Sequence, residues 1–237
     1  MDLKYFSITT NQAVEAKQKL DAFENGKLTL EDLNEKAGPE GCRELVGYYL
    51  LHTNEITEKA KLPVGRSCGG FNLFPEATNL GAQYVTVFSN DWRGWSLLGA
   101  AYNSLNLSNE SIHAYSNAIK LGDKDSSAAL AAVALKYNRV DLVQEMLPQL
   151  LSLKNDPQTS AKNKLNLISI LIYCSAKADR KDVFIKTLEG EDMKQILQNW
   201  MIKNNIRTAC KVFKGEDIDK IRRAVEAASK SETMSPQ

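Results

Sequence analysis

The chain has 237 residues, with 30 Lys and Arg against 29 Asp and Glu, and 43% of it is hydrophobic. These values exclude an intrinsically disordered chain, a collagen-like chain and a small protein held together by disulfides. A net charge near zero removes the simplest electrostatic reason to expect nucleic acid or a membrane surface as a partner. The charge is unevenly distributed, with −4 in residues 1–60 and +4 in residues 156–237, which leaves a weak head-to-tail homo-oligomer open.

Targeting and metal-binding signals are weak in this sequence. The first ten residues hold no apolar stretch of signal-peptide length, and the most apolar run, residues 165–174, is too short to cross a bilayer. The four cysteines form no CxxC pair, and neither His52 nor His113 lies near one of them in the sequence. We therefore expect a soluble cytoplasmic protein with reduced thiols, no metal and no other cofactor.

Helical periodicity dominates the N-terminal part of the chain. Apolar residues three, seven and ten positions apart predict a helix over residues 12–23, ended by an Asn-Gly pair. Thr29, with Asp32 three residues later, predicts a capped short helix that reaches about residue 35. A third apolar stripe predicts a helix at roughly 40–60.

The next segment differs in composition. Residues 61–80 contain two prolines and three glycines, and we expect an irregular loop that packs onto the helices through Phe71, Leu73 and Phe74. Residues 82–88 are rich in β-branched side chains, which favours a strand, although their spacing also fits a helix face. We favour a helix because no partner strand is visible elsewhere in the sequence.

From residue 92 onward the pattern becomes regular, and it predicts an all-α fold built as an array of antiparallel helical hairpins. Helices are expected near 92–105, 108–121, 126–137, 140–153, 159–176, 180–189, 191–204, 205–213 and 216–230. Ser108, with Ser111, is expected to cap the second of these helices. The predicted regions are N-terminal helices at 1–60, the irregular segment and connecting helix at 61–91, the hairpin region at 92–230 and a disordered tail at 231–237.

One segment carries a recognisable repeat motif. It matches W-x2-L-G-x2-Y without a gap, followed by an aromatic and a small residue 20 and 23 positions after the Trp. The matching residues are Trp95, Leu98, Gly99, Tyr102, Tyr115 and Ala118. Residues 92–125 therefore resemble one tetratricopeptide repeat, with degenerate neighbours at 78–91 and 126–153. The alternative is a non-repetitive helical bundle that happens to contain these residues.

The resemblance implies a binding function, because such arrays form a solenoid whose first helices line a groove for a peptide or a partner domain. The family's two-carboxylate clamp needs Lys and Asn where this chain has Ser96 and Ala100, so that clamp is absent. The alternative is that these small residues accept another helix of the same chain. We also expect Phe71 and Phe74 to lie on the same face as the groove. The predicted partner-binding residues are Arg93, Ser96, Asn103, Ser104, Phe71 and Phe74.

The segment from Gly65 to Gly70 is the only one that resembles an active-site loop. Its glycines could form a backbone nest for an anion, and Arg66 could lower the pKa of Cys68. A nucleophilic cysteine also needs a base, and neither histidine sits in a recognisable motif. We therefore expect a non-enzymatic interaction module, an adaptor or assembly subunit, with no catalytic residue. A small-ligand protein or cysteine-dependent enzyme that uses the Cys68 loop is the alternative.

The C-terminal helices carry a basic side next to two aromatic residues. Acidic residues interleave with these basic side chains in the sequence, which favours a solvated face over a nucleic-acid site. The basic residues are Arg207, Lys211, Lys214, Lys220, Arg222 and Arg223.

Overall fold

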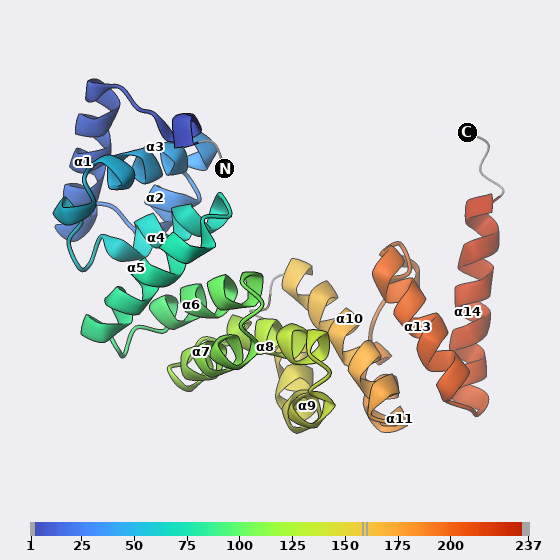
Figure 1. Cartoon of the computed structure of the whole chain (residues 1–237). Coiled ribbons are helices and arrows are strands. Elements are labelled where there is room, and N and C mark those ends of the chain that lie inside the picture. Colours follow the sequence, from blue (N-terminus) through green and yellow to red (C-terminus); the bar gives the residue numbers. More distant parts are fainter. Residues whose placement is uncertain (1–2, 158, 160, 234–237) are drawn as a thin grey trace. The chain divides into compact units, whose positions relative to one another are not determined.

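The computed structural model describes residues 3–157, 159 and 161–233, and in this part of the chain helices are the only regular secondary structure (Figure 1). The predicted all-α fold class is confirmed. The chain divides into two compact units, Met1–Ser126 and Ser127–Gln237. This boundary falls inside the region that the sequence predicts as a single run of hairpins. Among the described residues, no helix combines the length and the apolar character needed to span a membrane.

The first unit begins with two predicted features that the structure confirms, a helix ended by Asn25 and a capped short helix. The Thr29 hydroxyl accepts the Asp32 N–H at 3.2 Å, and the Asp32 carboxylate accepts the Thr29 N–H at 2.8 Å. The elements of this unit are η1 (Leu3–Phe6), α1 (Thr10–Glu24), α2 (Leu30–Asn34), α3 (Gly38–Leu51), η2 (Thr53–Glu55), α4 (Lys61–Gly70), α5 (Phe74–Val87), α6 (Trp92–Ser104) and α7 (Ser108–Lys120).

Two predicted boundaries in this unit are wrong. The helix expected at 40–60 ends at Leu51, because the backbone leaves helical geometry at His52 and only a short 3-10 turn follows. Ser108 is not a cap, since it is the first residue of α7 and the capping position is Leu107, which has no side-chain cap. The Ser111 hydroxyl instead donates to the Gly99 carbonyl at 2.8 Å.

The irregular loop predicted at 61–80 is also wrong, because the segment forms α4 and the first half of α5. Pro63 and Pro75 lie in the first turns of these helices, where a missing N–H breaks no helical hydrogen bond. Gly65 lies inside α4 at a close contact, since a Cβ on it would approach Leu97 Cδ2 to 2.9 Å. The helix favoured for residues 82–88 is confirmed through Val87, the last residue of α5.

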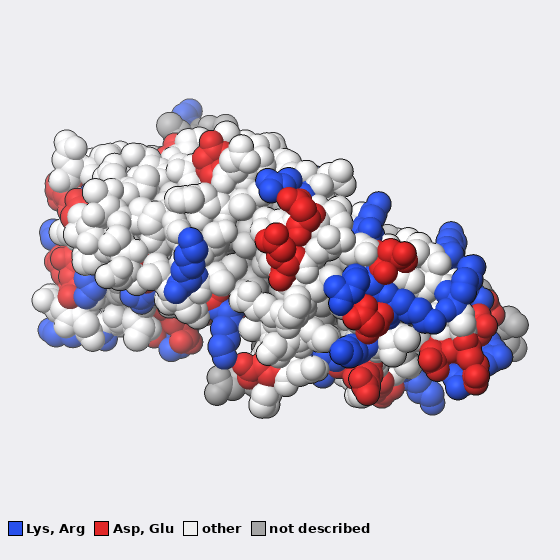
Figure 2. All heavy atoms as spheres, turned by 90° about the horizontal axis from the view of Figure 1, so that it is seen from below, with Lys and Arg blue, Asp and Glu red and all other residues white. Residues whose placement is uncertain are grey.

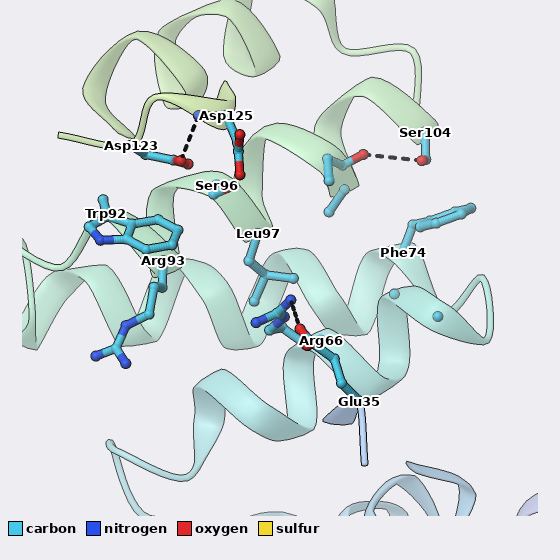
Figure 3. A pocket seen from close by; sticks show the side chains of 14 residues that line it. Glu35, Arg66, Phe74, Trp92, Arg93, Ser96, Leu97, Ser104, Asp123 and Asp125 are labelled. Carbon is cyan, nitrogen blue, oxygen red and sulfur yellow. Dashed lines mark hydrogen bonds and ion pairs between the residues drawn. The ribbon is translucent and has the colours of Figure 1, made fainter. Parts of the chain in front are cut away.

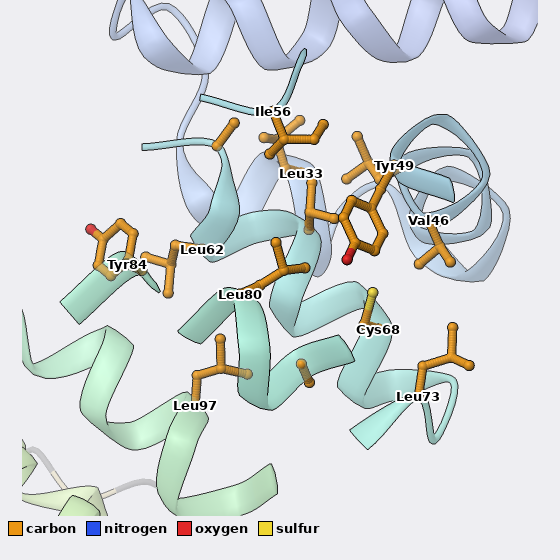
Figure 4. Packing of buried hydrophobic residues seen from close by; sticks show 14 of the residues in the cluster. Leu33, Val46, Tyr49, Ile56, Leu62, Cys68, Leu73, Leu80, Tyr84 and Leu97 are labelled. Carbon is orange, nitrogen blue, oxygen red and sulfur yellow. The ribbon is translucent and has the colours of Figure 1, made fainter. Parts of the chain in front are cut away.

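The core of the first unit is a continuous apolar cluster drawn from η1 through α7. Figure 4 shows side chains of α2, α3, α4, α5 and α6 converging on one another, with the Cys68 thiol among them. Close packing of α5 on α6 depends on Gly81 and Gly94. A Cβ on Gly81 would lie 3.0 Å from Leu98, and one on Gly94 would lie 2.6 Å from the Tyr84 ring.

Four helix-to-helix turns along the chain share one backbone geometry. A left-handed residue ends the first helix, and the next residue donates its N–H to a carbonyl five positions earlier, at 2.7–2.9 Å. That pattern is the Schellman motif, which terminates a helix by satisfying its last carbonyl groups. The left-handed residues are Asn72 (φ 62°), Asn106 (φ 60°), Asn138 (φ 57°) and Asp179 (φ 52°). They connect α4 to α5, α6 to α7, α8 to α9 and α10 to α11.

The second unit has its own core, in which α10 and α13 pack together with α11 and α14. The helix predicted at 191–204 is wrong, because Asn199 starts a new helix by accepting the N–H groups of Met201 and Ile202. The elements are α8 (Asp125–Lys136), which begins at the end of the first unit, then α9 (Val140–Asn155), α10 (Ala161–Lys177), α11 (Lys181–Leu188), α12 (Met193–Ile196), α13 (Trp200–Val212) and α14 (Glu216–Thr233).

Two predictions concern the C-terminal end of this unit. Because α14 continues to Thr233, residues 231–233 of the predicted disordered tail are helical, and 234–237 lie outside the described residues. On the face seen in Figure 2, blue and red side chains interleave over the C-terminal helices. Ion pairs such as Lys220 with Glu216 at 2.9 Å and Arg222 with Asp219 at 2.7 Å account for part of this mixture. This arrangement agrees with the predicted solvated face.

Candidate functional site

A groove with a volume of about 630 Å³ opens in the first unit. Its walls come from α4, the first residue of α5, one face of α6 and the segment 123–125. In Figure 3, Trp92 and Arg93 lie toward one end, Phe74 and Ser104 toward the other, and Leu97 lies between them. The lining residues are Glu35, Arg66, Gly69, Gly70, Phe74, Trp92, Arg93, Ser96, Leu97, Ala100, Ala101, Ser104, Asp123 and Asp125.

Helix α6 supplies half of this lining because its groove residues repeat every three or four positions. Small side chains, Ser96, Ala100, Ala101 and Ser104, alternate on this face with the larger Trp92, Arg93 and Leu97. Asp91 fixes the start of the helix by accepting the Arg93 N–H at 3.0 Å. The groove face is therefore set by the local register of α6.

The structure brings four of the six predicted partner-binding residues together in this groove: Arg93, Ser96, Ser104 and Phe74. Asn103 does not line it. Phe71 is also elsewhere, since its ring packs edge-on against Phe6 with centroids 5.4 Å apart, at the edge of the core. The expectation that Phe71 and Phe74 share the groove face is therefore wrong for Phe71, because the turn at Asn72 directs the two rings to different neighbours.

Arg93 is held by an acidic partner of its own. Its guanidinium binds the Asp91 carboxylate through two nitrogens, with the closest contact at 2.6 Å, and Tyr84 donates its hydroxyl to the same carboxylate at 2.6 Å. Burial raises the pKa of Asp91, but hydrogen bonds from Arg93 and Tyr84 outweigh it and hold the pKa below its usual value. The Arg93 guanidinium is thus paired with a carboxylate of the same chain, although its side chain remains 43% exposed.

Arg66 and Cys68 do not form the predicted reactive loop. Both lie in α4, where Arg66 points into the groove and pairs with Glu35 at 3.5 Å. The Cys68 side chain is 0% exposed, and burial, with the Glu76 carboxylate adding to it, raises the pKa of its thiol to about 12. The predicted lowering of this pKa by Arg66 is therefore wrong, since α4 directs the two side chains to opposite sides.

Ten of the fourteen lining residues were not among the predicted partner-binding residues, including Trp92, Leu97 and Asp123. Trp92 precedes Ser96 by one helical turn, so the register of α6 contains the signal that could have found it. Asp123 accepts the Asp125 N–H at 3.1 Å and the Ser126 hydroxyl at 2.5 Å, and it also lines the groove. Its place in the groove depends on the position of residues 123–125 beside α6, which no local pattern encodes.

The chemistry of the groove is that of a binding surface with aromatic ends and charged walls. Among the described residues, no group of three or more His, Cys, Asp or Glu side chains could hold a metal ion. Comparison of the chain with protein-family models and with curated proteins gave no match.

Proposed function

We propose that this protein is a non-enzymatic interaction module, an adaptor or assembly subunit, that binds a peptide segment of a partner protein in the α6 groove. One observation carries the proposal. Four residues selected from the sequence as partner-facing, namely Arg93, Ser96, Ser104 and Phe74, line a single open groove. A pocket with aromatic anchors and a few polar groups is the usual form of a recognition site.

We further propose that the hairpins form a tetratricopeptide-like array. Two features support this. The left-handed turn residues recur at intervals of 34, 32 and 41 positions, close to the length of one such repeat. Gly99 also has the role expected of the motif glycine, since a Cβ there would lie 2.7 Å from the Tyr115 ring of the next helix.

The alternatives have less support. A thiolate nucleophile needs an accessible thiol with a low pKa, whereas Cys68 is buried with a raised pKa. The interpretation that the small residues of α6 accept another helix of the chain does not account for the open volume over Ser96, Ala100 and Ser104. All four cysteines are free, which supports the proposed cytoplasmic location.

Site-specific photo-crosslinking in the source cells tests the proposed function. A benzophenone amino acid replaces Ser96 in the groove, and a matched protein carries it at Lys120, an exposed position of α7 that does not line the groove. We expect Ser96 to capture one polypeptide segment, identifiable by mass spectrometry, that Lys120 does not capture. Identical adduct patterns at both positions would contradict a groove-bound partner.

A further inference from the structure

The charges and aromatic rings of the groove define the class of peptide that fits it. We propose that the bound segment is extended and presents a basic side chain to the Trp92–Asp123 end, with an apolar side chain about five residues away at the Phe74 end. This proposal rests on the proposed function and adds a ligand chemistry to it.

The two arginines of the groove do not favour an acidic ligand. Arg93 binds Asp91 through two nitrogens, and Arg66 pairs with Glu35. In Figure 3 the Arg93 guanidinium extends away from Ser96 and Asp125. An acidic peptide would compete with these carboxylates for the arginines, and because the arginines are exposed to solvent, its net gain from either one would be small.

Asp123 is the carboxylate that a ligand can use. It is 7% exposed, and it accepts hydrogen bonds from two neutral donors, the Asp125 N–H and the Ser126 hydroxyl. The amino end of α8 stabilises this negative charge in the free protein. An incoming Lys or Arg would add the charge-assisted hydrogen bond that these neutral donors do not supply.

Aromatic side chains provide the rest of the selectivity. Trp92, which is 41% exposed, lies beside Asp123 in Figure 3 and offers its ring face to the aliphatic stem and the cation of the same basic residue. At the other end, Phe74 and the neighbouring small residues offer a site for an apolar side chain. Leu97 forms the apolar floor between the two ends.

The length of the groove sets the spacing. From Trp92 to Ser104 is twelve residues of α-helix, or about 18 Å at the usual helical rise. An extended peptide advances about 3.3 Å per residue, so about five residue steps cover this distance. A basic residue at one end and an apolar residue at the other would then be separated by about five positions.

A displayed library of random heptapeptides, selected on the full-length protein, tests the proposal. Counter-selection uses the Ala100→Trp variant, in which a bulky side chain at an exposed position of α6 fills the groove. We expect selected peptides to carry Lys or Arg about five positions from Leu, Ile, Met or Phe. Replacing the basic residue of a selected peptide by Glu should weaken its binding at least about tenfold, which corresponds to about 1.4 kcal/mol.

The Asp123→Asn variant identifies the recognising group. Asn keeps an oxygen that can accept the Asp125 N–H, so the cap survives while the charge is lost. We expect this variant to bind the basic peptide about tenfold more weakly and the matching Gln peptide unchanged. Glu110→Gln, an exposed position of α7 outside the groove, is the matched control.

The outcomes separate the two proposals. Enrichment of acidic or uncharged peptides, or equal binding of the Lys and Glu peptides, would refute the ligand chemistry and leave the interaction module standing. Absence of any peptide that prefers the wild type over Ala100→Trp, together with no specific adduct at Ser96, would refute the proposed function. If Asp123→Asn does not fold, the Lys-to-Glu exchange in the peptide still tests whether the groove prefers a basic side chain, because this exchange leaves the protein unchanged.

Discussion

The hairpins α4–α5 and α6–α7 turn in the same way but use their glycines differently. Asn72 and Asn106 occupy equivalent left-handed positions with φ values of 62° and 60°. Gly99 in α6 faces Tyr115 of its own hairpin, whereas Gly65 and Gly81 of the first hairpin face leucines of α6. Gly99 therefore fixes contact within its own hairpin, whereas Gly65 and Gly81, together with Gly94 of α6, fix contact between the two hairpins.

This difference has a functional consequence. Because Gly65 and Gly81 let α4 and α5 lie close to α6, the outer faces of α4 and α6 come near enough to form two walls of one groove. The α6–α7 contact instead fixes the orientation of α6 about its own axis. Together the two sets of contacts determine which α6 residues line the groove.

The largest effect is expected for Gly99→Leu. The new side chain would begin 2.7 Å from the ring of Tyr115, which is only 6% exposed and has little room to move. We expect a loss of about 3 kcal/mol in the free energy of unfolding, measured by urea denaturation. Gly70→Leu is the matched control, since a Cβ there meets nothing within 4 Å. Equal midpoints for Gly99→Leu and the wild type would contradict the close approach.

The second-largest loss of stability is expected at Phe71 and not at the nearby Phe74. Phe71 packs against Phe6 at the edge of the core, whereas Phe74 lines the groove. We expect Phe71→Ser to cost about 2 kcal/mol, because it removes packed apolar area, and Phe74→Ser to cost about 0.5 kcal/mol. Thermal melting measures both. The Phe74→Ser variant should fold normally but no longer capture the partner. If Phe74→Ser instead lost stability and Phe71→Ser lost only partner capture, the placement of these rings would be wrong.

The shared turn predicts a matched pair of smaller effects. Ala tolerates positive φ poorly, so Asn72→Ala and Asn106→Ala should each lower stability by about 1 kcal/mol. Gly at either position should restore most of this loss, because glycine adopts this conformation freely. Asn109→Ala, in the first turn of α7, serves as a control. Unequal losses at the two turns, measured by urea denaturation, would show that the hairpins are not closed in the same way.

The smallest effect is expected for the ionisation of the Cys68 thiol, which does not change stability at neutral pH. Burial raises the pKa of its thiol to about 12, from an ordinary value of 9.0, so folding favours the neutral form. Its contribution to stability is complete below pH 9 and is lost as the pH rises toward 12. Iodoacetamide should therefore label Cys68 in native protein only very slowly at pH 7, as mass spectrometry of the peptide would show. Rapid labelling would reopen the cysteine-dependent alternative.

The sequence by itself determined the features that depend on local periodicity. Side chains on one face of a helix recur every three or four residues, so the pattern from Trp92 to Ser104 was enough to predict α6 and three of its seven groove residues. The capping residues Thr29 and Asp32 are equally local, and the capping box they predict is present. The all-α fold class follows from the same kind of information.

Only the tertiary structure decided the positions at which the same residue type is compatible with two different environments. Gly65 and Pro63 suggest a loop when taken alone, yet they belong to a helix because a leucine from α6 packs against the glycine and the proline lies in a first turn. Phe71 and Phe74 are equally apolar, and their neighbours alone assign one to the core and one to the groove. Asp123 joins the groove because residues 123–125 lie beside α6. Each of these outcomes depends on which distant residues come into contact, and a local pattern does not carry that information.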